Sequence, residues 1–77
     1  MSFIPLKVLL RCADALYDAR MERNLTQEQA AELLDISVRW YQKLESGRSV
    51  PNFQLTYKIT EKFGINLIQI AEEVELK

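Results

Sequence analysis

Hydrophobic residues recur along the chain at spacings of three and four, which is the period of an amphipathic α-helix. The strict alternation that marks a β-strand is missing, and proline and glycine occur only at positions 5, 51, 47 and 64. The pattern predicts five helices: one from Pro5 to about Arg23, two short ones capped by Thr26 and Ser37, one over residues 53–63 and one from Asn66. We therefore expect an all-α fold, with residues 1–77 forming one compact five-helix domain.

Capping residues define the predicted helix boundaries. Thr26 followed by Gln29 has the spacing of a capping box, in which each side chain accepts a hydrogen bond from the other residue's backbone N–H. Ser37 is a typical N-cap residue, and Gly47 is placed to end the third helix. Asp35, in the turn between the second and third helices, tolerates the left-handed conformation that a tight turn needs.

Each predicted helix is expected to turn one face towards a common core. On the first helix this face comprises Leu6, Leu9, Leu10, Ala13, Leu16, Tyr17 and Arg20, with Phe3, Ile4 and Val8 lying beyond it. The fourth helix contributes Phe53, Leu55, Ile59 and Phe63, and the fifth contributes Leu67, Ile70, Ala71 and Val74. Cys12 and Tyr41 are expected in the core, and Trp40 is expected to seal its edge.

The third predicted helix has two chemically different sides. At about 100° per residue, Tyr41, Leu44 and Glu45 fall on one side, and Arg39, Gln42, Lys43 and Ser46 fall on the other. The outer side offers cations, an amide and a hydroxyl, which bond base edges and phosphates, although an ordinary solvated face is also possible. Two short helices joined by about three residues must cross steeply, which predicts a helix-turn-helix over about residues 26–46.

The distribution of charge agrees with a local binding surface. The net charge is −1 and the isoelectric point about 5.4, so the whole chain is not basic. Residues 38–62 nevertheless carry five cations and two anions, a local net charge of +3. A local basic patch of this kind can attract a polyanion even when the total charge is slightly negative.

The composition argues against several other classes of protein. With one cysteine and no histidine, the chain offers no internal disulfide and no metal-ligand spacing. Paired carboxylates in a cleft and a glycine-rich phosphate loop are also missing, so we expect neither an enzyme nor a cofactor. The lack of an internal disulfide fits a reducing cytoplasm, so we expect a cytoplasmic protein. The apolar stretch "FIPLKVLL" is interrupted by Pro5 and Lys7 and is too short to span a bilayer, so we expect no membrane contact.

One long segment, "LTQEQAAELLDISVRWYQKLESGRSVPNFQLTYKITEKFGINL", resembles the helix-turn-helix domain of the phage lambda repressor and Cro type, the XRE family. The resemblance rests on the "LTQ" opening, Ala31, the Leu44-Glu45 pair with a glycine two residues on, and the later "FGIN". It covers more than half of the chain.

The resemblance implies a lambda-repressor-like fold and a set of residue roles. DNA-binding positions are implied at Gln27, Val38, Arg39, Gln42, Lys43, Ser46, Arg48 and Asn52. Arg20 and Glu45 match a buried ion pair, and the inward position of Glu45 on the wheel independently calls for a cation. Asp35 replaces the usual turn glycine, at a cost on the order of 1 kcal/mol. Trp40 replaces a small polar residue beside the base-reading positions.

Two functions follow from these features. The first is a sequence-specific double-stranded-DNA-binding transcriptional regulator, expected to be a repressor and a homodimer on two half-sites about 34 Å apart. Its expected dimer contacts are the apolar groups of Phe3, Ile4, Val8, Leu67, Ile68, Val74 and Leu76. The alternative is an antitoxin or another protein-interaction module with the same fold, whose partner would be a toxin or another regulator.

Overall fold

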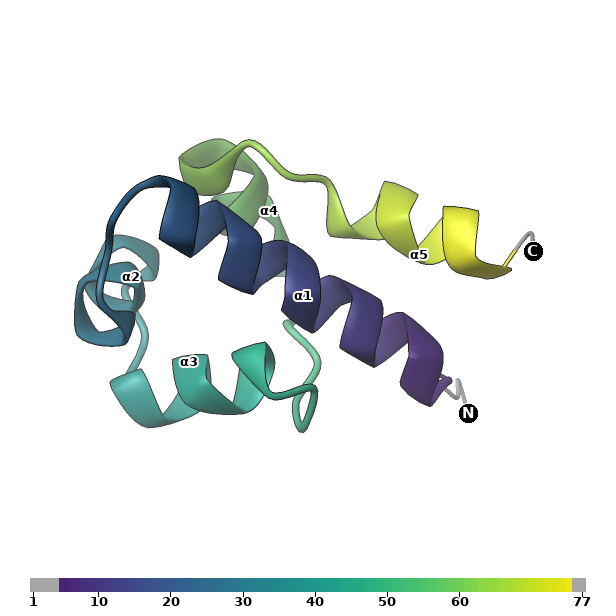
Figure 1. Cartoon of the computed structure of the whole chain (residues 1–77), viewed down its shortest axis with the longest axis horizontal. Helices are drawn as coiled ribbons and strands as arrows, with labels where there is room; N and C mark the ends of the chain where they lie inside the picture. The colour runs from purple at the N-terminus through teal and green to yellow at the C-terminus, as the bar shows by residue number, and fades with distance from the viewer. Residues whose placement is uncertain (1–4, 76–77) are drawn as a thin grey trace.

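The computed structural model describes residues 5–75, which form five α-helices and no strand (Figure 1). They are α1 (Leu6–Glu22), α2 (Gln27–Leu34), α3 (Val38–Glu45), α4 (Phe53–Phe63) and α5 (Leu67–Glu75). The predicted all-α fold and its five helices are confirmed. Among the described residues, no helix has the length and hydrophobicity needed to cross a membrane.

The long helix α1 is the element around which the other helices are arranged. It contacts α3 on one side and α5 on another, and it also touches α4 (Figure 1). The short helix α2 packs against both α3 and α4 at the end of the molecule where α1 finishes (Figure 1). Helix α3 is therefore braced from behind by α1 and α2, and its other side faces outward.

The helix boundaries arise from the capping residues that the sequence indicates. Thr26 Oγ1 accepts a hydrogen bond from the Gln29 backbone N–H at 3.1 Å, and Gln29 Oε1 accepts one from the Thr26 N–H at 2.9 Å. The side chains of Ser37, Asn52 and Asn66 each accept a hydrogen bond from the backbone N–H three residues later, at 2.8–3.1 Å. Each cap satisfies a backbone donor that the first turn of a helix leaves free.

Two of the tight turns depend on a left-handed backbone. Asp35 ends α2 with φ 59°, as predicted from its place between two short helices. Gly47 follows α3 with φ 78°, and a Cβ atom added there would lie 3.1 Å from Leu10 Cδ2. A side chain at position 47 would therefore meet both backbone strain and a close neighbour on α1.

The core lies between α1, α2, α3 and α4, with one contribution from α5. Its cluster consists of Ala15, Leu16, Ala19, Ala30, Ala31, Leu34, Tyr41, Leu44, Leu55, Ile59, Phe63 and Leu67. Cys12 is half-buried against this cluster, and burial raises the pKa of its thiol. Small alanines on α1 and α2 allow the helices to approach closely around the large side chains of Tyr41 and Phe63.

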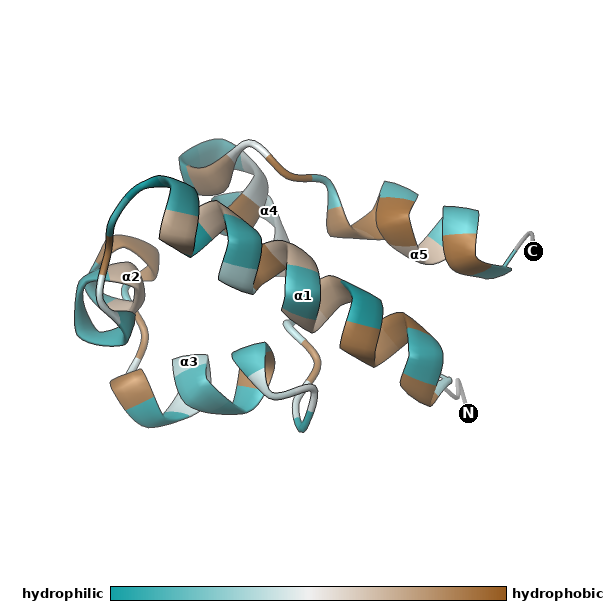
Figure 2. Ribbon diagram, in the orientation of Figure 1, coloured by the Kyte–Doolittle hydropathy of each residue, from teal (hydrophilic) through white to brown (hydrophobic). Residues whose placement is uncertain are grey.

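Several predictions about which side chains are buried are wrong. Leu6, Leu10 and Tyr17 are 63%, 46% and 46% exposed, whereas Val8 is only 4% exposed. The neighbours of α1 cover a different part of its circumference, and hydrophobic residues therefore remain at the surface of its first turns (Figure 2). Phe53 is 82% exposed because, at about 100° per residue, it lies on the opposite side of α4 from Leu55.

The left-handed turn at Asp35 leads to a direct stability test. Replacing Asp35 with glycine should raise the free energy of unfolding by about 1 kcal/mol, because glycine adopts positive φ without a Cβ penalty. The matched control is Asp35→Ala, which removes the same exposed ion pair with Lys58 but keeps the Cβ atom. Urea unfolding of both variants measures the difference, and equal stabilities for Gly and Ala would contradict a strained turn.

Candidate nucleic-acid interface

Helix α3 separates buried and exposed side chains as the sequence predicts. Tyr41 and Leu44 are 0% and 2% exposed and belong to the core. The four residues of the opposite side, Arg39, Gln42, Lys43 and Ser46, are all exposed. The Ser37 cap fixes the start of α3 and the Gly47 turn fixes its end, so this outer side has a defined orientation.

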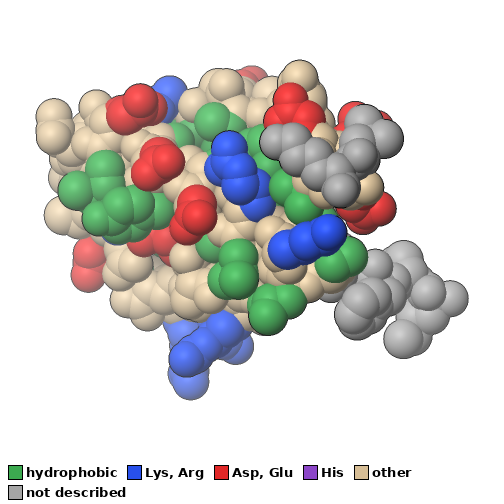
Figure 3. All heavy atoms as spheres, turned by 45° about the vertical axis from the view of Figure 1, so that its right-hand side comes forward, with side chains coloured by type: hydrophobic (Ala, Val, Ile, Leu, Met, Phe, Trp, Pro, Cys, Tyr) green, Lys and Arg blue, Asp and Glu red, His purple; other side chains and the backbone are tan. Residues whose placement is uncertain are grey.

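The cations around α3 are available to a ligand. Arg39, Lys43 and Arg48 are exposed, and among residues 5–75 none of the three lies in an ion pair. Basic side chains gather at the lower edge of the molecule in Figure 3, where Figure 1 places α3. The carboxylate of Glu45 points inward instead. The outer side of α3 therefore has positive charge with no acid on the same helix to cancel it.

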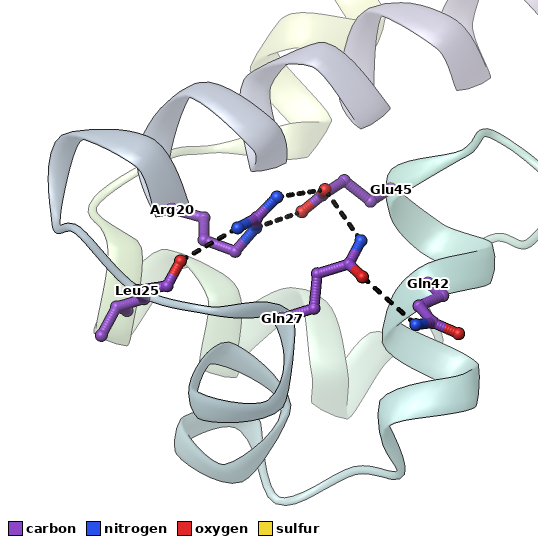
Figure 4. Close-up of polar contacts among 5 residues, drawn as sticks. All are labelled: Arg20, Leu25, Gln27, Gln42 and Glu45. Carbon is purple, nitrogen blue, oxygen red and sulfur yellow. Dashed lines mark hydrogen bonds and ion pairs between the residues drawn. The ribbon is translucent and has the colours of Figure 1, made fainter.

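The carboxylate of Glu45 forms a bidentate ion pair with Arg20 of α1 (Figure 4). Arg20 Nε donates to Glu45 Oε2 and Arg20 Nη2 donates to Glu45 Oε1, both at 2.8 Å. The third guanidinium nitrogen, Nη1, donates to the carbonyl of Leu25 at 2.9 Å. The two side chains are only 11% and 7% exposed, so the predicted buried pair is confirmed.

Gln27 extends this pair to the outer side of α3 (Figure 4). Its Nε2 donates to Glu45 Oε1 at 3.2 Å, while its Oε1 accepts a hydrogen bond from Gln42 Nε2 at 3.2 Å. Gln42 is thus held by its amino group, and its own amide oxygen remains without a hydrogen bond among the described residues. The hydrogen bond between Gln27 and Gln42 connects the first residue of α2 to the middle of α3. The sequence analysis did not predict this hydrogen bond.

The remaining predicted site residues differ in how exposed they are and in which hydrogen bonds they already make. Val38 is half-buried and packs against the core, so only part of its side chain faces outward. Ser46 Oγ donates to the carbonyl of Lys43 at 3.1 Å. Asn52 uses its Oδ1 atom to cap α4, accepting from Leu55 N–H at 2.8 Å, which leaves its amino group for other partners. Arg48 lies in the exposed turn that joins these two helices.

Trp40 is half-buried and packs against the core, as expected for a residue at the core's edge. Together with Ile36 and Leu55 it lines a small hollow between the α2–α3 turn and α4. The indole therefore supports the position of α3 from the side facing α4.

The electrostatics of the ion pair follow from its burial and its hydrogen bonds. Burial alone would raise the pKa of the Glu45 carboxyl, but the hydrogen bonds, led by those from Arg20, outweigh it and lower the pKa. The hydrogen bond to Glu45 raises the pKa of the Arg20 guanidinium. Burial also raises the pKa of the Tyr41 hydroxyl. Both members of the pair are charged at neutral pH.

The chain is similar to known helix-turn-helix proteins. A family model described as helix-turn-helix matches residues 16–70. Multiprotein-bridging factor 1b of Arabidopsis thaliana is 38% identical over 53 residues, which are 69% of this chain and 37% of that protein. The HTH-type transcriptional activator BcrR of Enterococcus faecalis is 35% identical over 63 residues, 82% of this chain and 31% of that protein. The chain thus spans about a third of the length of these relatives.

The buried pair should control the stability of the whole fold. Glu45→Ala should lower the free energy of unfolding by about 3–5 kcal/mol, because Arg20 would stay buried without its partner. The double variant Arg20→Ala with Glu45→Ala should lose less than the sum of the two single losses. Thermal unfolding followed by circular dichroism measures both effects, and an unchanged melting temperature for Glu45→Ala would contradict the pair's role.

The lowered pKa of Glu45 predicts how this contribution depends on pH. Folding stabilises the deprotonated form of Glu45, so its pKa is lower in the folded state than in the unfolded state, where it is near the ordinary value of 4.5. The stabilisation should therefore be complete above that value and should be lost as the pH falls through the lower pKa of the folded state.

We expect the difference in unfolding free energy between the natural chain and Glu45→Gln to shrink as the pH falls below about 4.5. Chemical denaturation from pH 7 to pH 3 measures this difference, with the exposed substitution Glu61→Gln as the control. A constant difference over the whole range would show that the carboxylate charge contributes nothing.

Proposed function

The chain belongs to the helix-turn-helix family, of the XRE type, and from this premise we propose that it is a sequence-specific double-stranded-DNA-binding regulator of transcription. The observation that carries the proposal is the outer side of α3. There Arg39 and Lys43 are exposed without an ion pair among the described residues, and the acid of the same helix is buried with Arg20. The major groove of a duplex admits an α-helix, and an exposed helix face with cations and no acid suits its phosphates and base edges.

The side chains on this face divide by chemistry into two proposed roles. Arg39 has the planar fork that bonds two acceptors of guanine, and Gln42 has the amide that pairs with adenine. A bidentate contact of either kind discriminates against the wrong base by roughly 1–3 kcal/mol. Lys43, Arg48 and the amino group of Asn52 are proposed to contact phosphates. Such contacts set the position of the protein and make binding sensitive to salt.

Gln27 has a place in both roles. It begins α2, next to backbone N–H groups of that helix's first turn, which suits a phosphate. Its side chain also holds the Gln42 amide at 3.2 Å, so we propose that it orients Gln42 towards the base edge. Val38 is proposed to contact a thymine methyl with the part of its side chain that is not packed on the core.

The oligomeric state and the direction of regulation are further parts of the proposal. One recognition helix reads only a few base pairs, so useful specificity calls for a homodimer on two half-sites about 34 Å apart. Repression requires only that the bound dimer cover an operator. We propose it on that ground, although one relative is named an activator.

Part of the dimer contact expected from the sequence is already used by the core. Val8 and Leu67 are each only 4% exposed, which corrects that prediction. Phe3, Ile4 and Leu76 lie outside the described residues.

A second candidate function is protein interaction, either as an antitoxin or as a bridging module. Two observations favour it: one relative is named a multiprotein-bridging factor, and α4 exposes two aromatic side chains. Phe53 and Tyr57, one turn apart, are 82% and 65% exposed. Large exposed aromatic residues are enriched where proteins meet. The two functions are compatible, because the aromatic pair lies on a different helix from Arg39 and Lys43.

Selection of bound sites from random double-stranded DNA, followed by affinity measurements, tests the main proposal. Arg39→Ala should weaken binding to the selected site by about 1–3 kcal/mol, or roughly 5- to 150-fold, and should relax specificity at one base position. Lys62→Ala on α4 is the control, because it removes one exposed cation away from α3. Equal affinity for all sequences at physiological salt would contradict sequence-specific binding.

Two double variants separate the two candidate functions. If protein interaction is the function, the double variant Arg39→Ala with Lys43→Ala should keep its biological activity, and Phe53→Ala with Tyr57→Ala should lose it. If DNA binding is the function, the first variant should be inactive. Circular dichroism confirms in each case that the variant is folded.

A further inference from the structure

The side chains of Glu45, Gln27 and Gln42 form an amide network that runs from the interior to the outer side of α3 (Figure 4). Gln27 Nε2 donates to Glu45 Oε1, and Gln42 Nε2 donates to Gln27 Oε1, each at 3.2 Å. The side chain of Glu45 is 7% exposed, whereas Gln42 is exposed. The amide network therefore connects a buried charge to the surface that we propose binds DNA.

The buried end of the amide network can only accept hydrogen bonds. The hydrogen bonds from Arg20 lower the pKa of the Glu45 carboxyl, so it is ionised at neutral pH and has no proton to donate. The side-chain amide of Gln27 therefore has to turn its amino group towards Glu45. The opposite orientation would place the amide oxygen against a negatively charged oxygen. The charge of Glu45 thus fixes which way round the Gln27 amide lies.

The orientation of Gln27 in turn fixes the orientation of Gln42. Because the amino group of Gln27 points to Glu45, its oxygen points to Gln42, which has to supply an N–H. Gln42 then offers its amide oxygen outwards, with its second N–H beside it. A glutamine without such a partner can turn its amide over and offer either group. The amide network removes this freedom.

We propose that Glu45, although it is buried, determines the base preference of Gln42 by way of Gln27. In the major groove, adenine and cytosine present an amino group where guanine and thymine present a carbonyl oxygen. The outward oxygen of Gln42 accepts a hydrogen bond from an amino group and is repelled by a carbonyl oxygen. The base beside Gln42 is therefore adenine or cytosine, an assignment that rests on the proposed DNA-binding function.

Contact with the DNA backbone would favour the same orientation of Gln27. Among the described residues, the second N–H of its amino group makes no other hydrogen bond, and it lies beside backbone N–H groups of the first turn of α2. A phosphate oxygen, like a carboxylate oxygen, only accepts hydrogen bonds. A phosphate bound there would therefore draw the amino group of Gln27, and not its oxygen, towards the same side.

Binding to a set of duplexes tests the base preference. Gln42→Ala identifies the base position that Gln42 reads in the selected site, because the preference at that position should disappear. On duplexes with each base at that position, the natural chain should prefer adenine or cytosine over guanine or thymine by roughly 5- to 150-fold. Gln27→Leu should lower this ratio severalfold, because the Gln42 amide can then turn over. The variant keeps the Thr26 cap and the buried ion pair.

Gln27→Lys should reverse the base preference towards guanine or thymine. Lysine has donors only, so it can donate both to Glu45 and to the oxygen of Gln42, whose amino group then faces outwards. Glu28→Gln is the matched control, because it changes the net charge in the same turn of α2 by the same amount. Glu28 is exposed and is not part of the amide network, so this variant should keep the natural preference.

The amide network can also be tested without DNA. In a proton–nitrogen correlation spectrum, Gln27→Leu should move a side-chain amide proton of Gln42 upfield, because that proton loses its hydrogen bond. The side-chain amide of Gln54, exposed on α4, is the internal control and should not move.

Two results would overturn the proposal: side-chain resonances of Gln42 that do not change in Gln27→Leu, or a base preference that is the same in the natural chain and in both Gln27 variants. The second result, on duplexes that are still bound tightly, would leave the DNA-binding function intact and remove only the role of Glu45. A chain that binds no duplex would instead overturn the DNA-binding function and the base preference together.

Discussion

The buried ion pair between Arg20 and Glu45 is the contact on which the arrangement of the other helices depends. Each oxygen of the carboxylate accepts a hydrogen bond from the guanidinium at 2.8 Å, and the guanidinium also bonds the carbonyl of Leu25. These bonds join α1, the approach to α2 and the end of α3 at one point. Because the two side chains are only 11% and 7% exposed, losing either one leaves the charge of the other poorly solvated and unpaired. The pair therefore favours one relative position of the three helices.

The same pair gives α3 its two different sides. Glu45 is the acid of α3, and its inward position leaves Arg39 and Lys43 exposed with no carboxylate on their own helix. The side-chain amide of Gln27 donates a hydrogen bond to Glu45 and accepts one from Gln42, so Gln42 is linked to Glu45 through Gln27. A structural contact in the interior thus determines both the charge and part of the geometry of the surface that we propose binds DNA.

Local features of the sequence predicted most of the fold. The capping box at Thr26, the left-handed turn at Asp35 and the inner side of α3 each depend on residues close together in the chain, and all are confirmed. The Arg20–Glu45 pair was also predicted, from the family resemblance and from the inward position of Glu45. Within the candidate site, the exposure of Arg39 and Lys43 followed from the period of a single helix.

The errors have a common physical cause, which is that the covered part of a helix depends on its neighbours. Hydrophobic residues lie on more than one side of α1. The sequence alone therefore does not show whether Val8 or Leu10 is the buried residue. Phe53 was assigned to the core although its angular position opposed Leu55. The hydrogen bond between Gln27 and Gln42 joins two helices, and no spacing in the sequence indicates it.

An NMR titration of the chain with its selected DNA duplex tests the central proposal most directly, because it reports on every backbone amide at once. We expect the largest changes in amide chemical shift in α3, in the first turn of α2 and in the turn that contains Arg48. Changes confined to α4 and α5, with α3 unaffected, would contradict the proposal that α3 enters the groove.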